Sequence, residues 1–592
     1  MGLANNLPLW QEGMLTPNIV IPFLGVLPSD FTFSRSSSAT RWNEEGKLVW
    51  ADENLIRYSQ DIGNSVGTSW ASYNVSYFTS NAGVAPDGTQ TACSITPSAT
   101  MGGRYFNSGV SVIAGFQYTT SAYFKRVSGG TTLQLGVANQ DVFGDAAGDR
   151  YFQFNGTTGA FIAKSAEVSA YDIEELPDGW FRVSGTFTPT VSAPLKPSLY
   201  GESGVTFYAW GAQVEHTSYD SPQTYRATTS AAYYGPRFEY NPATGELKGL
   251  LLEEQSTNSF LHSGDLTNAA WTLSAVTRET SSELAPDGTS YYTKLTATAA
   301  FASASQFQAV AEGEYWTASY YVKKGSSSLV TIVQEGTGAK ATFNLDEGVI
   351  TLGTGDLYYN SSIEQISADE YRINLTLLIN DTVTTIAPRI LLGEYSAANL
   401  TGEYMYVWGA QLENGRTASS YIPTTSAAAT RAADNLYTTN LPWFNADKGT
   451  MLIEASLKDV SRYYQLASFD NGTIAERVSL ASNVGHVRGA IYAGGVSSVN
   501  YLEQMGLEIV KNTVFKAALA WSDETDIATI AEGGESHAGN GSGSTGTFVT
   551  PDVSKLVLFN RSGSAAYASG HIKSFKYWNR RLSDIELQRI TS

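Results

Sequence analysis

Paired carboxylates are the first residues of this chain that could do chemistry. A strand that reads Glu-x-Asp-x-x-Glu projects two carboxylates from one face, one as nucleophile and one as acid for cleaving a glycosidic bond. The nearest match runs Glu524-Thr525-Asp526-Ile527-Ala528-Thr529, lacks the second glutamate, and leaves Glu532 off the pattern. We therefore predict a solvated turn here and no catalytic residue.

Two glycine-rich stretches match functional motifs by their letters alone. The sequence Gly534-Glu535-Ser536-His537-Ala538 is close to a nucleophile elbow, and residues 541–546 are close to a dinucleotide-binding loop. An elbow needs a strand-to-helix turn, and a dinucleotide loop needs a strand and a helix around it. Neither context is predicted, so both stretches are interpreted as flexible loops.

Metal ligands are sparse in this sequence. The five histidines are scattered without a pair at ligand spacing, and the single cysteine, Cys93, excludes cysteine-based zinc clusters and an intrachain disulfide framework. Loop carboxylates such as Asp87 or Asp287 could hold a structural calcium ion with main-chain carbonyls, because calcium accepts irregular oxygen cages. A turn explains both aspartates better, and no cofactor is expected.

One stretch occurs twice and organises the chain. Residues 404–413 read Tyr-Met-Tyr-Val-Trp-Gly-Ala-Gln-Leu-Glu, and residues 208–215 read Tyr-Ala-Trp-Gly-Ala-Gln-Val-Glu. The sequence Thr-Thr-Ser-Ala-Ala follows each copy, at 424–428 and at 228–232. Strand alternation puts Gln411 and Glu413 on one face and predicts that the other, buried face carries Tyr406, Trp408, Ala410 and Leu412.

Further landmarks keep the same order in both copies. Ala-Pro-Asp-Gly-Thr occurs at 85–89 and again at 285–289, a turn in which proline presets one dihedral angle and glycine permits a positive one. Self-similarity at a nearly fixed spacing indicates a duplicated unit. We predict two homologous jelly rolls or β-sandwiches, at 54–232 and 258–435, because turns separate many short alternating strands.

The remaining segments differ in character. Residues 1–53 begin with apolar residues broken by prolines, which fits an extended arm that packs on another molecule or covers a core edge of its own chain. Residues 233–257 read as a hairpin connector. Residues 436–592 form a last β-unit that ends in a short helix, because Ser583 and Glu586 have capping-box spacing and Leu582 can pack on Leu587.

Composition indicates an all-β chain and argues against several partners. Only 16% of the 592 residues are charged, which favours pleated surfaces over long surface helices. The net charge of −19 argues against nucleic acid and anionic lipid, since both require a basic surface. Without a signal-like start or an apolar run of roughly 18 residues, we expect no membrane insertion and a chain made and kept in a cytoplasm.

Three segments carry a resemblance to known proteins: Ser-Ser-Ala-Thr-Arg at 37–41, the Thr-Gly-Glu to Thr-Asn connector at 244–258, and Trp-Gly-Ala-Gln-Leu-Glu to Ile-Pro-Thr-Thr at 408–425. They resemble recurrent pieces of phage tail fibres, tail spikes and head fibres. In such proteins, carbohydrate-binding-module-like jelly rolls precede a concanavalin-like (laminin G-like) sandwich that closes with a pattern like residues 577–587. The module at 54–232 departs from this pattern, because the family's early segment commonly runs straight into the connector.

The resemblance implies an appendage of the virion surface, on tail or capsid, assembled in the cytoplasm of a host bacterium. Its N-terminal arm would attach to other virion proteins, and its subunits would form a homotrimer. Its sandwich modules would bind a host-surface glycan, and because the paired carboxylates are missing we expect binding without cleavage. Two other functions stay open, a glycan depolymerase and a purely structural head-decoration or fibre protein.

Aromatic side chains are the natural candidates for glycan contact, because sugars stack their apolar C–H faces on such rings. The chain has 34 Tyr and 12 Trp, and adjacent pairs such as Tyr358-Tyr359 must direct one ring outward if they lie in strands. Terminal modules of such fibres are the usual contact point, so the predicted ligand-binding residues are Trp521, Tyr463 and Tyr464. The motif tryptophans, Trp210 and Trp408, are predicted to be buried in the core.

Overall fold

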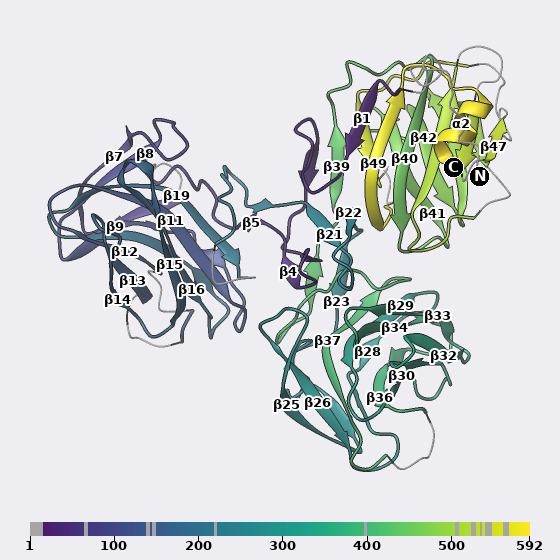
Figure 1. Ribbon diagram of the computed structural model, residues 1–592, viewed down its shortest axis with the longest axis horizontal. Coiled ribbons are helices and arrows are strands. Elements are labelled where there is room, and N and C mark those ends of the chain that lie inside the picture. The colour runs from purple at the N-terminus through teal and green to yellow at the C-terminus, as the bar shows by residue number, and fades with distance from the viewer. Residues whose placement is uncertain are drawn as a thin grey trace, which may run out of the picture. The chain divides into compact units, whose positions relative to one another are not determined.

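A computed structural model (Figure 1) shows a chain built almost entirely of β-strands, as predicted. It describes residues 16–63, 69–137, 142–144, 148, 150–217, 222–395, 400–503, 508–522, 528–532, 535–538, 548–560 and 567–592. The chain divides into two compact units, Trp50–Gly235 on the one hand and Met1–Val49 with Pro236–Ser592 on the other. The former holds one β-sandwich and the latter holds two.

The first sandwich, in Trp50–Gly235, has two antiparallel six-stranded sheets. One has the order β15-β16-β11-β19-β8-β7, with bounds Val168–Leu176, Trp180–Phe187, Tyr118–Ser128, Thr206–His216, Ala92–Pro97 and Val75–Gly83. The other has the order β14-β13-β12-β18-β9-β6, with bounds Phe161–Lys164, Arg150–Asn155, Thr132–Val137, Pro197–Glu202, Met101–Phe106 and Trp70–Tyr73. Two short pairs complete it, β10 (Val110–Ser111) with β17 (Pro194–Leu195) and β5 (Glu53–Asn54) with β20 (Tyr233–Tyr234).

The second sandwich repeats this topology strand for strand. One sheet has the order β33-β34-β29-β37-β26-β25, with bounds Tyr358–Gln365, Glu370–Leu378, Tyr315–Lys323, Tyr404–Asn414, Tyr291–Ala297 and Val276–Leu284. The other has the order β32-β31-β30-β36-β27-β24, with bounds Val349–Thr354, Lys340–Asn344, Leu329–Val333, Arg389–Leu392, Ser303–Ser305 and Thr272–Ser274. The short pairs recur as β28 (Gln308–Ala309) with β35 (Thr385–Ile386) and β23 (Ser256–Asn258) with β38 (Ala429–Arg431).

The repeated tryptophan is buried in both copies, but on the face opposite to Leu412, which corrects the simple alternation. Gly409 has a positive φ of 59°, and the pairing of β29 with β37 shifts register between Ser319 and Tyr321. A bulge inserts one residue and so reverses the faces beyond it. Leu412 therefore lies in the core between the sheets, whereas Trp408 packs outside the sheet against Tyr321 and Tyr421. The first sandwich has the same bulge at Gly211, whose φ is 61°.

The C-terminal sandwich is assembled from distant parts of the chain. One sheet has the order β21-β22-β49-β40-β45-β46-β47, with bounds Arg237–Tyr240, Leu247–Leu252, Gly570–Trp578, Gly449–Leu457, Phe515–Trp521, Ala528–Glu532 and Glu535–Ala538. The facing sheet has the order β2-β39-β48-β41-β42-β43-β44, with bounds Thr32–Ser34, Asn435–Thr438, Lys555–Leu558, Tyr463–Asp470, Arg477–Asn483, His486–Ala493 and Val496–Glu503. It thus takes in the connector hairpin, β21 and β22, and part of the N-terminal arm.

The described part of the arm lies on its own chain. Strand β1 (Ile19–Pro22) pairs antiparallel with β49 (Figure 1). Ile21 and Phe23 belong to the core of the C-terminal sandwich. This matches the expectation that the arm covers a core edge of its own chain. Residues 1–15, where an attachment to another molecule was predicted, lie outside the described residues.

Buried charges connect the hairpin to the second sandwich. Arg237 is fully buried and donates from Nη1 to Glu253 Oε2 at 2.7 Å, and from Nη2 to Asp434. Glu253 also accepts from Ser420 N at 2.8 Å and from Lys458 Nζ at 2.7 Å. Burial opposes the ionised form of Glu253, but the cations Lys458, Arg431 and Arg237 outweigh it and hold the pKa of Glu253 well below its usual range. This network fixes the elements around the candidate site.

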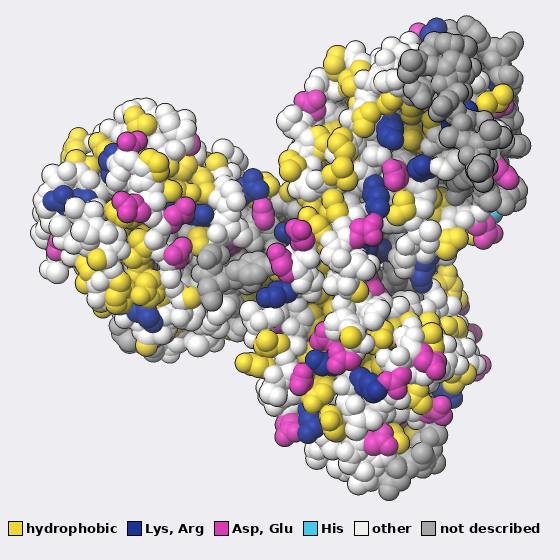
Figure 2. All heavy atoms as spheres, viewed as in Figure 1, with side chains coloured by type: hydrophobic (Ala, Val, Ile, Leu, Met, Phe, Trp, Pro, Cys, Tyr) yellow, Lys and Arg dark blue, Asp and Glu magenta, His cyan; other side chains and the backbone are white. Residues whose placement is uncertain are grey.

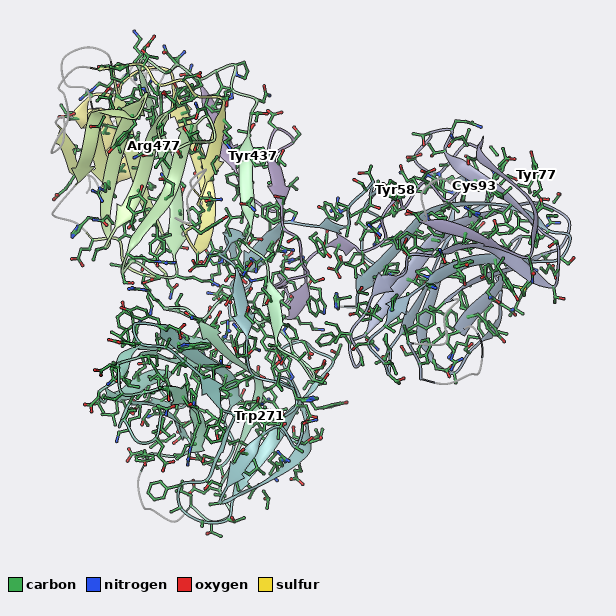
Figure 3. The ribbon with its side chains drawn as sticks, turned by 180° about the vertical axis from the view of Figure 1, so that it is seen from behind. Tyr58, Tyr77, Cys93, Trp271, Tyr437 and Arg477 are labelled. Atoms are coloured by element: carbon green, nitrogen blue, oxygen red, sulfur yellow. The ribbon has the colours of Figure 1, made fainter. Side chains whose placement is uncertain are left out.

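The predicted terminal helix is present as α2 (Asp584–Thr591). Ser583 and Glu586 form the capping box, and Leu582 and Leu587 share one apolar cluster. Among the described residues no helix is long and apolar enough to cross a membrane. Cys93 is buried within the strands of the first sandwich (Figure 3), and Lys, Arg, Asp and Glu are interspersed over the face shown in Figure 2.

Candidate functional site

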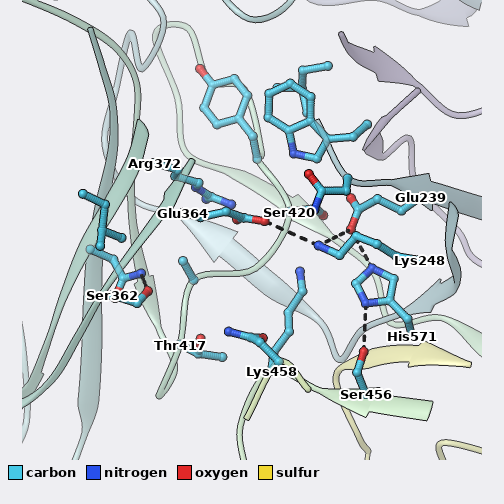
Figure 4. A pocket seen from close by; sticks show the side chains of 18 of the residues that line it. Glu239, Lys248, Ser362, Glu364, Arg372, Thr417, Ser420, Ser456, Lys458 and His571 are labelled. Carbon is cyan, nitrogen blue, oxygen red and sulfur yellow. Dashed lines mark hydrogen bonds and ion pairs between the residues drawn. The ribbon is translucent and has the colours of Figure 1, made fainter. Parts of the chain in front are cut away.

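The second unit contains a polar cavity of about 320 Å³, here called the central cavity (Figure 4). Segments that are distant in sequence form it, among them the N-terminal hairpin of Trp42 and Leu48, the connector hairpin, strands β33 and β34 of the second sandwich, residues 417–421, and strands β40 and β49. Its lining includes Trp42, Leu48, Glu239, Asn241, Lys248, Tyr321, Ser362, Glu364, Arg372, Asn374, Thr417, Tyr421, Ser456, Lys458, Asn512 and His571.

A hydrogen-bonded chain of three side chains runs along one wall. Glu239 Oε2 lies 2.7 Å from His571 Nε2, and His571 Nδ1 lies 3.4 Å from Ser456 Oγ (Figure 4). Burial lowers the pKa of His571 to about 4, and the nearby Lys248 ammonium adds to this effect. The imidazole is therefore neutral near pH 7, with Nε2–H donating to the Glu239 carboxylate.

Glu239 is kept ionised despite its burial. Burial alone would raise its pKa, but the hydrogen bond from His571 and the charge of Lys248 outweigh it and hold the pKa of Glu239 below its usual range. Lys248 Nζ lies 3.9 Å from Glu239 Oε2 and 3.4 Å from Glu364 Oε1. One ammonium thus lies between two carboxylates.

The other cations of the cavity are also engaged. Lys458 is paired with Glu253, and Arg372 donates to Ser419 O at 2.7 Å and to Ser319 Oγ at 3.1 Å. The Arg372 guanidinium also lies 5.1 Å from the centre of the Tyr321 ring. Since both lysines are paired with carboxylates and Arg372 is hydrogen-bonded within the protein, the cavity suits a neutral ligand with many hydroxyl groups better than an ion.

The structure places the three predicted ligand-binding residues away from this cavity. Trp521 is fully buried and donates its indole N–H to Ala446 O at 3.1 Å, and Tyr464 is 2% exposed. In this structure neither ring presents a face to solvent, because both lie in the core of the C-terminal sandwich. Tyr463 is half-buried, and its hydroxyl donates to Gln465 Oε1 at 3.0 Å. A role of the three residues in ligand binding stays a prediction.

Other predicted positions have structural roles. Asp87 Oδ1 accepts from Thr89 N at 2.9 Å, and Asp287 Oδ1 accepts from Ser290 N at 2.8 Å, so both aspartates close turns. The paired-carboxylate stretch lies largely outside the described residues, as do residues 541–546. In the near-elbow stretch, 535–538 form strand β47, and Gly534 lies outside the described residues. No cluster of His, Cys, Asp and Glu suited to a metal ion occurs within the described residues.

The residues that do form the cavity were missed from the sequence. Glu239 and Lys248 lie in the connector hairpin, and His571 lies in the last strand, more than three hundred positions further on. The available signal was a polar residue within an otherwise apolar strand, as for Glu239 and His571. This signal does not show which two residues meet, because the pairing of β22 with β49 cannot be read from either strand alone.

No family model matches the chain, and no curated protein matches it. Among solved structures, the CBM40 of Ruminococcus gnavus IT-sialidase bound to α2,3-sialyllactose is 19% identical, covers 25% of this chain and 84% of its own, and has a TM-score of 0.22. A SAP-like pentraxin from Limulus polyphemus is 12% identical, and the match covers 25% of this chain and 70% of the pentraxin with a TM-score of 0.20. Trypanosoma rangeli sialidase is 10% identical, and the match covers 89% of this chain and 99% of the sialidase with a TM-score of 0.21. Such low TM-scores carry no argument about function.

Proposed function

We propose that this protein is a non-enzymatic fibre or spike component of a phage virion, and that it binds a neutral glycan of the host surface in the central cavity. The observation that carries the binding site is a recess lined by hydroxyl, amide and paired charged groups. Its volume of about 320 Å³ lies at the lower end of typical small-molecule sites. The virion location, attachment through residues 1–53 and a homotrimer follow from the sequence resemblance. In a trimer, three weak sites would add up through multivalency.

Binding without cleavage is favoured by the state of the carboxylates. A glycosidase needs one carboxylic acid whose pKa is raised so that it can protonate the leaving oxygen. Glu239 has its pKa lowered instead, and Lys248 lies within 4 Å of both Glu239 and Glu364. Glu239 therefore lacks the proton that the reaction requires, and one ammonium lies beside both carboxylates.

The test uses the full chain on immobilised bacterial capsular polysaccharides and O-antigens. The variants Lys248→Met and Ser362→Ala each change one polar group of the cavity, and we expect each to weaken retention at least about tenfold. The control Lys294→Met removes an exposed ion pair to Glu279 outside the cavity and should bind like the wild type. Retention that is unchanged in both cavity variants, or reducing ends released by the wild type, would contradict the proposal.

A second candidate function rests on the Glu239-His571-Ser456 chain, whose carboxylate, imidazole and hydroxyl follow the order of a hydrolase triad. In such an enzyme, Ser456 Oγ would attack the carbonyl carbon of an ester on the glycan and His571 Nδ1 would take its proton. The alcohol would leave with that proton, and water would then release the acid. The Ser456–His571 distance of 3.4 Å is long for such a pair.

Acid release from acetylated polysaccharide separates this candidate from simple binding. The binding proposal predicts that neither the wild type nor Ser456→Ala releases acid. Release by the wild type that Ser456→Ala abolishes would establish the esterase instead.

A further inference from the structure

We infer that the first sandwich carries a saccharide site of its own, in a pocket beside Trp180. This inference rests on the proposed glycan binding and adds a second site, in a different unit from the central cavity. The pocket, here called the Trp180 pocket, has a volume of about 420 Å³. It is lined by Val84, Ala85, Pro86, Gly88, Lys125, Leu176, Pro177, Asp178 and Trp180.

The equivalent position in the second sandwich is filled by the chain itself. There the hairpin of β3 (Thr40–Trp42) and β4 (Leu48–Trp50) places Trp42 and Leu48 in one cluster with Ala285 and Ile366. Leu48 N donates to Pro286 O at 2.9 Å. In the first sandwich the matching carbonyl, Pro86 O, accepts no main-chain hydrogen bond from any described residue. One repeat has thus closed this pocket, and the other leaves it open.

The residues at the open pocket have also diverged from their counterparts. Strand pairing puts Glu370 opposite Lys323 in the second sandwich, where the first has Trp180 beside Lys125. Lys323 forms an ion pair with Glu283 at 2.9 Å. Among the described residues, neither Lys125 nor Asp178 has an ion-pair partner, although both line the pocket. A free donor and a free acceptor therefore lie at the same recess.

Trp180 supplies the third polar group. Its side chain is 3% exposed and packs with Tyr208 at a ring distance of 6.4 Å, yet its indole N–H has no hydrogen-bond partner among the described residues. The motif tryptophan nearby, Trp210, donates to Thr91 Oγ1 at 3.0 Å. An indole N–H that makes no hydrogen bond within the described part of the protein can donate to a ligand oxygen in this pocket.

These groups define the ligand class. An ammonium and an indole N–H donate, a carboxylate accepts, and Leu176, Pro177 and Val84 provide apolar surface. Vicinal hydroxyls of a sugar offer both acceptors and donors, and its C–H face offers an apolar surface. Because Lys125 and Asp178 carry opposite charges, a neutral sugar unit fits better than an acidic one.

The test follows the indole ¹⁵N–¹H resonances of the full chain during titration with methyl glycosides of glucose, galactose, N-acetylglucosamine and rhamnose. Trp180 is assigned by the resonance that is missing in Trp180→Phe, which keeps the ring packing. We expect at least one glycoside to shift this resonance, and Lys125→Ala or Asp178→Asn to weaken its affinity about tenfold. The matched control, Lys323→Ala at the closed position of the second sandwich, should change the affinity less than about twofold.

Three results would overturn this assignment. In the first, no glycoside shifts the Trp180 resonance. In the second, only an acidic glycoside shifts it, and the shift is stronger in Asp178→Asn; in the third, only a peptide of residues 38–50 shifts it. Loss of polysaccharide binding in Lys248→Met but not in Trp180→Phe would reject this second site and leave the central cavity standing. The reverse pattern would reject the central cavity and leave this site standing.

Discussion

At the scale of single residues, the repeated motif is explained by structure rather than by ligand contact. Gln411 Oε1 accepts from Ile422 N at 2.7 Å, and Glu413 Oε1 accepts from Ser419 N at 2.8 Å. In the first sandwich, Gln213 Oε1 accepts from Arg226 N at 2.9 Å, and Glu215 Oε1 accepts from Gln223 N at 2.8 Å. The glutamine and glutamate hold the segment that follows each strand over the outer aromatic cluster.

Glu215 gives a prediction at this scale. Burial raises its pKa to about 8, although the hydrogen bond from Gln223 N acts in the opposite direction. At pH values between the ordinary pKa of a glutamate and about 8, Glu215 is protonated in the folded state and ionised in the unfolded state. The stability that the protonated carboxyl contributes is therefore lost as the pH rises through about 8. We expect the midpoint temperature of the calorimetric unfolding transition of the first sandwich to decrease as the pH is raised from about 5 to about 9. The decrease should be smaller in Glu215→Gln.

The glutamine variant is a close control for its own experiment, because it keeps the size of the side chain and an oxygen acceptor. A transition whose pH dependence is the same in Glu215→Gln and in the wild type would show that this carboxyl is not the group responsible.

At the scale of elements, the glycine bulge decides which side chains of β19 and β37 face the core. Sequence alternation identified the strand but gave the wrong face for Trp408, because one inserted residue reverses every position beyond it. The Gly in Trp-Gly-Ala was the available signal. Its positive φ, however, depends on the pairing with β29, which the strand sequence alone does not reveal.

Substitution at the bulge tests this element. A Cβ at Gly409 would lie 2.5 Å from Tyr321 Cδ2, and its φ of 59° disfavours a side chain. We expect Gly409→Ala to lower the free energy of unfolding of the second sandwich by more than about 2 kcal/mol in urea denaturation. Gly402→Ala is the control, with a φ of 89° and no atom within 4 Å of the added Cβ, and should cost about 1 kcal/mol from backbone strain alone. Equal losses in the two variants would contradict the packing argument.

Local signals in the sequence predicted other elements well. The capping box of α2 lies within a few residues, and the turns at 85–89 and 285–289 are specified by their own Pro, Asp and Gly. The elements that the sequence did not predict depend on pairing across the chain. Strand β1 pairs with β49 across more than five hundred residues, and the hairpin strand β22 also joins β49.

At the scale of the whole molecule, the two repeats have taken different roles. The second sandwich closes its outer pocket with residues 42 and 48 and contributes a wall to the central cavity, whereas the first keeps its outer pocket open. The central cavity itself could not be predicted, because its lining comes from segments as distant as Trp42 and His571. The prediction that Trp521, Tyr463 and Tyr464 bind a ligand was based on residue type alone, and residue type does not distinguish an aromatic ring in the core from an exposed one.

The central claim concerns where the ligand lies, and a structure of the full chain with the best-retained polysaccharide fragment tests it most directly. The account predicts density for a neutral sugar unit in the central cavity, within hydrogen-bond distance of Lys248, Glu364 or Asn512. Density elsewhere on the second unit, with this cavity empty at saturating ligand, would contradict it.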